Sequence, residues 1–270
     1  MMDAQPEFPG SSEAGFPKNL IEPGDLRSIL SNLSQEFSRQ LLSLRAGFDI
    51  LLSDSSTAIS ADQRQHVHVM VNLCDDLLRL TRSYVEYAGL VQGGAPLCLG
   101  RFSIGGFVKE IDRVHGRLAA EHGRGWNCRL DGDDTKVTTD AGRCQRIFEI
   151  LVANAVRYTP EGAEVRVAAR SDGTHWVVSV SDDGPGIPKE DLERVFEPFY
   201  KLPRDERAKM SGDGLGLAIC REMVEQLGGE IALNSAFGKG TQVKVRFPVV
   251  ASEKDMSNPY RRFRPATQSL

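Results

Sequence analysis

The sequence contains few of the features that mark secreted, membrane or nucleic-acid-binding proteins. Its 270 residues include five isolated cysteines without C-x-x-C spacing, which argues against a zinc or disulfide framework and indicates buried, reduced thiols. No apolar run approaches the roughly 20 residues of a membrane-spanning helix, and no basic-then-apolar signal pattern opens the chain. The net charge of −4 gives no electrostatic reason to bind nucleic acid. We therefore expect a cytoplasmic protein with no transmembrane segment and no nucleic-acid partner.

The first third of the chain predicts a helical hairpin. Residues 1–23 carry several prolines and glycines and predict a flexible leader. Apolar residues then recur at spacings of three and four over residues 26–51, and a second such stripe covers residues 66–87. A short polar stretch separates the two stripes. Ser60 or Asp62 is a suitable cap for the second helix.

A lone hairpin over residues 24–95 cannot cover both of its apolar stripes. Pairing two hairpins into a four-helix bundle is the economical solution, so we predict a homodimer through the helical hairpin. Packing against the rest of the same chain is the alternative. His66 falls on the second stripe and is predicted to be a hydrogen-bonded core residue.

Residues 96–250 predict a second domain in which helices and strands alternate. Asp172-Gly173 is a strong hairpin turn signal between two of the strands. Because several connections are hairpins, we expect an α+β protein with a mixed sheet and helices on one of its faces. The predicted helices cover residues 103–122, 140–158, 190–195 and 215–227, and the predicted strands cover residues 128–130, 136–138, 164–170, 176–181, 230–234 and 242–247. The tail, residues 251–270, lacks periodicity and is predicted to be disordered.

An ordered series of motifs in this second domain predicts a nucleotide pocket. The series is Asn154, then Asp182–Gly186, then Gly212–Leu217, then Gly238–Thr241. Each motif is weak alone, because a glycine cluster usually marks only a turn. The carboxylate of Asp182 can accept a hydrogen bond from an exocyclic amine, while the glycines let a ring approach the backbone. In this order, at the ends of predicted strands and helices, the motifs together indicate an ATP site.

Each of the other motifs suits one part of a nucleotide. The amide of Asn154 suits Mg²⁺, which takes few protein ligands; a cap or a loop contact is the plainer alternative. Residues 212–217 lead into a helix whose amides suit phosphate oxygens, although they form neither a P-loop nor a Rossmann turn. The polar and basic residues 201–211 predict either a mobile lid or a solvated loop. Asp182 and Asp183 would point to opposite faces of a strand, so a joint acid–base pair is not expected.

These segments resemble the N, G1, F, G2 and G3 boxes of sensor histidine kinases, a family in the gyrase, Hsp90, histidine kinase and MutL ATPase group. The F box is Phe196–Tyr200, and the hairpin resembles the family's dimerisation and phosphoacceptor domain. The resemblance implies a Bergerat-type ATP-binding sandwich, ATP and Mg²⁺ as ligands, and a response-regulator receiver domain as a partner. It implies that Asn154 holds Mg²⁺ and that Asp182 reads the adenine amine. The other implied ATP-site residues are Arg157, Tyr158, Gly184, Gly186, Gly212, Gly214, Leu215, Gly216 and Thr241, with Lys201 and Arg204 contacting phosphates from the lid.

The phosphoacceptor segment departs from the family. The family box resembles Ser-His-Glu-Leu-Arg-Thr-Pro-Leu, whereas residues 34–41 read Ser-Gln-Glu-Phe-Ser-Arg-Gln-Leu. Gln35 stands at the position of the acceptor histidine, and its amide nitrogen has no available lone pair. Glu36, at the catalytic position that would orient this histidine, is left without its partner. Arg39 replaces the residue that aligns a water for phosphatase activity, and Ile150 replaces the glutamate base of ATP-hydrolysing relatives.

Three functions follow from this combination. The first is a histidine-kinase homologue that binds ATP without phosphorylating a histidine at the usual position, a pseudokinase-like regulator or scaffold of a phosphorelay. The second is an active protein kinase with another acceptor; Ser34 and Ser38 lack a positioned base, and His66 or a partner protein is a further option. The third is an ATP-driven conformational clamp, which Ile150 disfavours.

Overall fold

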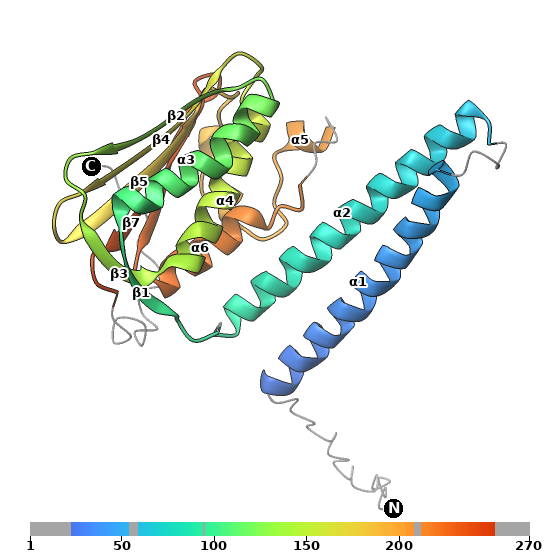
Figure 1. Cartoon of the computed structure of the whole chain (residues 1–270), viewed down its shortest axis with the longest axis horizontal. Helices are drawn as coiled ribbons and strands as arrows, with labels where there is room; N and C mark the ends of the chain where they lie inside the picture. Colours follow the sequence, from blue (N-terminus) through green and yellow to red (C-terminus); the bar gives the residue numbers. More distant parts are fainter. Residues whose placement is uncertain (1–22, 54–58, 94, 208–211, 252–270) are drawn as a thin grey trace, which may run out of the picture.

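The structure is a computed structural model that describes residues 23–53, 59–93, 95–207 and 212–251. An antiparallel helical hairpin precedes an α/β domain built on a five-stranded sheet (Figure 1). The α+β class and the mixed sheet predicted from the sequence are confirmed. The predicted leader, the predicted tail and most of the stretch between the first two helices lie outside the described residues. Within the described ranges, no helix combines the length and the apolar character that a bilayer span requires.

The hairpin consists of α1 (Pro23–Ser53) and α2 (Ala61–Val91). A capping box starts α2, because Ser60 Oγ accepts from the Gln63 N–H at 3.2 Å and Gln63 Oε1 accepts from the Ser60 N–H at 2.8 Å. The predicted cap at Ser60 is therefore confirmed. An ion pair of 3.1 Å between Arg45 and Asp75 joins the two helices.

The predicted apolar stripe of α2 lies at the surface of the single chain. Cys74 and Leu78 are the side chains buried along the middle of the hairpin, whereas Leu73 and Leu77 are 55% and 49% exposed. The prediction that His66 is a core residue is wrong for the single chain, because its side chain is exposed and lies 3.7 Å from Asp62. The helix thus carries two adjacent apolar stripes, and the sequence pattern identified the one that the hairpin leaves uncovered.

The five-stranded sheet has the order β2-β4-β5-β7-β6. Its β2 and β4 are parallel and every other neighbouring pair is antiparallel. The strands are β2 (Gly125–Asp131), β4 (Glu164–Ser171), β5 (His175–Asp182), β6 (Glu230–Ser235) and β7 (Thr241–Pro248), and a separate antiparallel pair is formed by β1 (Leu99–Ser103) and β3 (Lys136–Asp140). The hairpin turn predicted between β4 and β5 is confirmed, with Gly173 in the left-handed region at φ 87°.

Three helices pack on one face of this sheet, α3 (Ile104–Glu121), α4 (Ala141–Tyr158) and α6 (Gly216–Gln226) (Figure 1). Buried and half-buried residues alternate along β4 and β5, as expected when one face of a strand carries the core. Phe148, Trp176 and Phe247 are fully buried in this core, and the rings of Trp176 and Phe247 stack with centroids 4.9 Å apart.

Several short elements differ from the sequence-based expectation. The helix predicted over residues 190–195 is instead two 3₁₀ turns, η1 (Lys189–Asp191) and η2 (Arg194–Phe196). Neither β1 nor the five-residue helix α5 (Pro203–Arg207) was predicted, because segments this short show no periodicity. Cys98 is exposed beside the edge strand β1, so the expectation of buried thiols fails there and holds for Cys74, Cys144 and Cys220.

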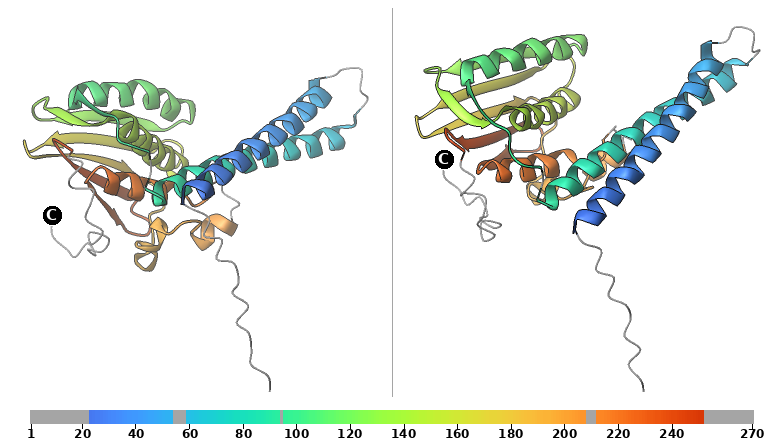
Figure 2. Two further views of the ribbon diagram at one scale, coloured as in Figure 1. Left: turned by 90° about the horizontal axis from the view of Figure 1, so that it is seen from below. Right: turned by 60° about the horizontal axis from the view of Figure 1, so that its bottom comes forward.

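The C-terminal half of α2 packs against the α/β domain, beside α6 (Figure 2). The Arg146 guanidinium in α4 donates to both carboxylate oxygens of Glu86, at 2.9 and 2.8 Å. Gln226 Nε2 donates to the Leu90 carbonyl at 2.9 Å. The Tyr84 ring stacks on Phe199 with centroids 6.2 Å apart. The hairpin is therefore joined to the domain by polar and aromatic contacts and by Leu90, which is buried in the hydrophobic core of the domain.

Candidate nucleotide-binding site

A cavity of about 350 Å³ opens between α4, the sheet, α6 and the segment that carries α5. It brings together most of the residues that the sequence predicted for the ATP site. The predicted residues that line it are Asn154, Arg157, Tyr158, Asp182, Gly186, Lys201, Arg204, Gly212, Gly214, Gly216 and Thr241. Gly184 and Leu215 are not among its lining residues, and Leu215 is fully buried in the core.

The carboxylate of Asp182 lies at the end of β5, on one wall of this cavity. Its Oδ1 accepts from the Gly184 N–H at 2.9 Å, and the backbone of Thr241, its cross-strand neighbour in β7, donates a second hydrogen bond. Burial raises the pKa of the Asp182 carboxyl, and these two hydrogen bonds offset only part of that rise. Asp182 is thus a largely desolvated acceptor, which a ligand N–H can complete.

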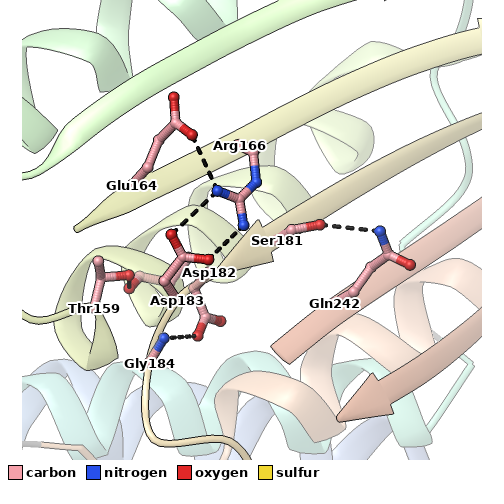
Figure 3. A network of polar contacts seen from close by, with 9 residues as sticks. Thr159, Glu164, Arg166, Ser181, Asp182, Asp183, Gly184 and Gln242 are labelled. Atoms are coloured by element: carbon pink, nitrogen blue, oxygen red, sulfur yellow. Dashed lines mark hydrogen bonds and ion pairs between the residues drawn. The ribbon is translucent and has the colours of Figure 1, made fainter. Parts of the chain in front are cut away.

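Its neighbour Asp183 belongs to a separate surface network. Figure 3 shows the Asp183 carboxylate turned toward Arg166 and the Asp182 carboxylate turned toward Gly184. Arg166 Nη1 donates to Asp183 Oδ2 at 3.1 Å and to Glu164 Oε2 at 3.0 Å. These hydrogen bonds from Arg166 hold the pKa of Asp183 below its usual value. The two carboxylates point apart as predicted, so only Asp182 is available to the cavity.

Glycines behind Asp182 let two backbone segments approach one another. Gly186 has φ 65°, and a Cβ there would lie 2.0 Å from the Ala236 carbonyl oxygen. Gly240 has φ 78°, and a Cβ there would lie 2.0 Å from the carbonyl oxygen of Asp182 itself. The Gly238 N–H donates to the Pro185 carbonyl at 2.7 Å and ties the two loops together. The sequence predicted that the glycines after Asp182 let a ligand ring approach the backbone; Gly186 lines the cavity and, like Gly240, also lets two loops pack closely.

The side chain of Asn154 projects from α4 toward the start of α6. A Cβ on Gly216, the first residue of α6, would lie 3.8 Å from Asn154 Nδ2 and 3.0 Å from the Ile150 side chain. Within the described chain the Asn154 amide has no hydrogen-bond partner, so its oxygen is available to a cation or a ligand. The described residues contain no group of three His, Cys, Asp or Glu side chains that suits a metal. An ion bound here would take the Asn154 oxygen and complete its shell with ligand and water oxygens, as Mg²⁺ does.

The turn before α6 is held against the Phe199 loop. Gly214 has φ 72°, and a Cβ there would lie 2.7 Å from the Phe199 backbone. The Phe199 N–H donates to the Gly214 carbonyl at 3.0 Å, and Phe199 itself adopts the left-handed φ of 65°. The Leu215 N–H donates to Asp213 Oδ1 at 3.0 Å. This packing aims the N-terminus of α6, with its free N–H groups and positive dipole end, at the cavity.

The segment with α5 forms the outer wall. Leu202 and Asp205 are buried, so the solvated-loop alternative does not describe this part, and residues 208–211 lie outside the described residues. Arg204 Nε lies 3.2 Å from Asp205 Oδ1. Burial, together with the charge of Asp205 and a hydrogen bond to it, raises the pKa of Tyr158. The hydrogen bond between Tyr158 and Asp205 ties this wall to α4.

Several lining residues were not identified from the sequence. Arg79 and Ser83 reach the cavity from α2, and no local signal predicts this because it depends on how the hairpin packs on the domain. Four apolar side chains line the cavity on the same side as Asp182. Those in β5 and β7 could have been predicted, because side chains two residues apart in a strand point to the same face. The four are Val180, Ile187, Leu233 and Val243.

The predicted acceptor position lies apart, in a shallow open depression on α1. Gln35 is exposed there. Glu36 accepts from Gln40 Nε2 at 2.9 Å through Oε1 and pairs with Arg39 through Oε2. Both oxygens of the predicted orphaned glutamate are therefore engaged by residues that differ from the family box.

This sheet, its three-helix layer and its glycine-bounded cavity, preceded by a helical hairpin, define a sensor histidine kinase transmitter core. In agreement, residues 139–251 match the family described as histidine kinase-, DNA gyrase B-, and HSP90-like ATPases, to which this part of the chain belongs. The expected Bergerat-type fold is thereby confirmed.

Known relatives support the same assignment. The sensor histidine kinase WalK of Bacillus subtilis is 36% identical over 241 residues, which are 85% of this chain and 38% of WalK. The solved full-length ShkA in complex with AMPPNP is 28% identical with a TM-score of 0.66, over 82% of this chain and 46% of ShkA. Histidine kinase ThkA, solved in complex with the response regulator protein TrrA, shares the fold at 21% identity and a TM-score of 0.59, over 84% of this chain and 64% of the ThkA chain. The chain spans less than half the length of the curated relatives it matches.

Proposed function

We propose that this chain binds ATP with Mg²⁺ in the cavity and acts in two-component signalling as a regulator that forms no phosphohistidine at position 35. The observation that carries ATP binding is the convergence of three groups on one cavity. They are Asp182, a desolvated acceptor; the Asn154 amide, which is unpaired among the described residues; and the N-terminus of α6. ATP complements these groups at both of its ends. The adenine amine can donate to Asp182, and the phosphates can bind the start of α6 and a metal ion held by Asn154. The complex of the related ShkA with AMPPNP supports this choice of ligand.

Each part of the nucleotide has a counterpart in the cavity. Asp182 accepts from the adenine amine, and Val180 and Ile187 supply apolar contacts for the base. Arg157 and Lys201 form no ion pair within the described chain, so both are free to meet phosphate charge, and Arg204 joins them from α5. The amides before and at the start of α6, at Gly212, Gly214 and Gly216, face the same phosphates. Tyr158 and Thr241 complete the lining beside the base.

The same cavity suits Mg²⁺. Asn154 would hold the ion through its amide oxygen, and the cavity offers no competing cluster of ligands in the described chain. The ion would neutralise part of the phosphate charge.

The hairpin is proposed to dimerise and to meet a receiver domain. Leu73, Leu77 and Met70 form part of an apolar stripe left exposed on α2, and Phe37 and Leu44 are exposed on α1. Exposed apolar stripes along two adjacent helices are typical of a surface that a second copy covers. The solved complex of the related ThkA with the response regulator TrrA suggests the kind of signalling partner.

The acceptor segment is proposed to be inactive in histidine phosphorylation. Gln35 cannot accept a phosphoryl group as an imidazole does, and the Arg39 and Gln40 contacts hold Glu36 away from that role. His66 cannot act as the acceptor for a nucleotide bound in its own chain, because it lies far from the cavity. Arg79 is the first residue of α2 that lines the cavity, and His66 lies more than three turns before it, about 20 Å along the helix axis.

Incubation with γ-phosphate-labelled ATP tests this proposal. We expect no acid-labile label on the wild-type chain, and acid-labile label on the triple variant Gln35→His/Arg39→Thr/Gln40→Pro, the restored variant, which restores an imidazole and removes both side chains that engage Glu36. The restored variant combined with Asn154→Ala is the control and should lose the label, because it lacks the amide that holds the metal. Acid-labile label on the wild type would contradict the proposal, whereas acid-stable label would favour a kinase with a hydroxyl acceptor.

A further inference from the structure

The cavity has a wall that does not belong to the ATPase domain. Arg79 and Ser83 lie in α2, far outside the segment 139–251 that matches the ATPase family, and still line the same cavity as Asn154 and Asp182. The hairpin is brought there by the contacts of Glu86 with Arg146 and of Tyr84 with Phe199.

The Arg79 guanidinium has incomplete hydrogen bonding. Its Nη2 donates to Asp76 Oδ1 at 2.9 Å, which holds the side chain beside the helix. Its Nε is buried and has no hydrogen-bond partner in the described chain. Arg204 shows the same feature, with Nε near Asp205 and a buried Nη1 that lacks an acceptor among the residues that the structure describes. Two guanidinium groups from α2 and from α5 therefore line one cavity with unsatisfied donors, an arrangement that favours a polyanion between them.

The location of Arg79 points to the phosphate end of a ligand. Asp182 and Thr241, which mark the base end, lie on β5 and β7. Arg79 lies little more than one turn before Tyr84 in α2, and the Tyr84 ring stacks on Phe199. Phe199 is followed in the chain by Lys201 and Arg204, the two basic residues on the outer wall of the cavity. A planar guanidinium with several parallel N–H groups matches phosphate oxygens better than any group on adenine.

We propose that Arg79, assisted by the Ser83 hydroxyl, binds the phosphate chain of the nucleotide and so makes the hairpin part of the binding site. This inference rests on the proposed function, ATP binding in the cavity, and adds a residue from outside the ATPase domain to it. Nucleotide binding and the docking of α2 then strengthen one another by the same factor, since coupling between two equilibria is reciprocal.

Calorimetric titration of the whole chain with AMPPNP and Mg²⁺ tests the role of Arg79. Arg79→Ala should weaken binding roughly 10- to 30-fold, the loss of a charge-assisted contact to phosphate, and Arg79→Lys should lie between it and the wild type. Arg82→Ala is the matched control, because Arg82 is an exposed arginine of the same helix that does not line the cavity. It should change the affinity less than 2-fold. Adenosine binding, followed by NMR titration, should be the same in all four proteins, and thermal unfolding should confirm that each is folded.

The outcomes separate this inference from the function on which it rests. A wild-type chain that binds no nucleotide overturns both. Wild-type binding with equal affinities for Arg79→Ala and Arg82→Ala overturns the role of Arg79 and leaves the ATP site intact. An equal loss of adenosine and AMPPNP affinity in Arg79→Ala also overturns it, because that result means a general effect on the cavity. Competition by inorganic tripolyphosphate that weakens in Arg79→Ala supports a direct phosphate contact.

Discussion

The α/β domain and the helical hairpin differ in what they keep of the transmitter-core pattern. In the domain, Asp182, Asn154 and the start of α6 converge on one cavity. In the hairpin, Gln35 stands at the predicted acceptor position, and Arg39 and Gln40 engage the glutamate beside it. The proposed nucleotide site and the predicted acceptor position therefore belong to different elements, so one can change without the other.

The structure predicts that the cavity and the acceptor position differ in their sensitivity to substitution. The cavity is shaped by backbone segments in close contact, such as Gly186 against Ala236 and Gly240 against Asp182, where any side chain would collide with a neighbour. The acceptor position is an exposed site on a helix, where a glutamine costs little, because glutamine is a good helix former. Loss of the acceptor leaves the fold unharmed, whereas loss of the cavity would disturb it.

The largest effect expected from this contrast follows substitution of Gly240. Gly240→Ala places a methyl group 2.0 Å from the Asp182 carbonyl oxygen, at a left-handed φ of 78°. Strain at φ and the forced backbone shift together should lower the free energy of unfolding by about 3–5 kcal/mol. Denaturant unfolding of the purified protein measures this loss.

Gly238→Ala is the matched control for that substitution. Gly238 lies in the same turn with φ 76°, but a Cβ there meets nothing within 4 Å. It should cost only the strain of the left-handed conformation, about 1 kcal/mol. Equal costs for the two variants would show that the close approach behind Asp182 is unimportant, and would weaken the contrast between the two regions.

A somewhat smaller effect is expected at the base end of the cavity. Asp182→Ala should weaken ATP binding about 100-fold, because it removes the acceptor and leaves two backbone N–H groups unpaired. Asp183→Ala is the control and should change ATP affinity less than 3-fold, since Asp183 contacts Arg166 on the surface. Calorimetric titration checks both. Similar losses from the two variants would mean that the cavity does not read the ligand through Asp182.

Replacement of Asp182 by asparagine, which keeps an acceptor oxygen, should not lower the stability of the fold. Burial raises the pKa of this carboxyl in the folded chain, so at neutral pH its ionised form is less favourable in the folded state than in the unfolded state. Asp182→Asn removes that charge and should leave the melting temperature at pH 7 unchanged or raise it. The advantage of the variant should shrink as the pH falls through the raised pKa. A marked drop in melting temperature at pH 7 would show that the charge stabilises the fold.

The elements that the sequence predicted well are those with long periodic patterns or strong caps. The bounds of α3 and α4 were predicted almost to the residue, and in the structure the side chains of Ser103 and Asp140 cap their N-termini. Short elements such as α5 and the 3₁₀ turns carry no period and were missed or assigned the wrong type. Their conformation depends on tertiary contacts such as the hydrogen bond of Tyr158 to Asp205.

In the candidate site, too, residues in local motifs were predicted and residues placed by tertiary packing were missed. The motif series predicted one cavity, and Asn154, Asp182, Gly212, Gly214 and Gly216 do line one cavity, because they lie in or beside α4, β5 and α6, which pack together. Arg79 could not be found, since its place depends on how α2 packs on α4 and α6. The apolar stripe of α2 shows that periodicity identifies an apolar face without identifying what covers it.

The smallest expected effect tests the contact that joins the two regions. Glu86→Gln removes the charge of a bidentate pair with Arg146, whose partners are both partly exposed. We expect a loss of about 0.5–1 kcal/mol in the docking of α2 on the domain. Limited proteolysis within residues 92–98 measures this, because cleavage follows the population of the undocked form and should accelerate about 2- to 5-fold. Glu110→Gln is the matched control, as it breaks a similar pair with Arg113 inside α3 and should leave the cleavage rate unchanged. Equal rates in the two variants would mean that Glu86 does not hold the hairpin, and that the aromatic contact of Tyr84 with Phe199 and the Gln226 hydrogen bond suffice.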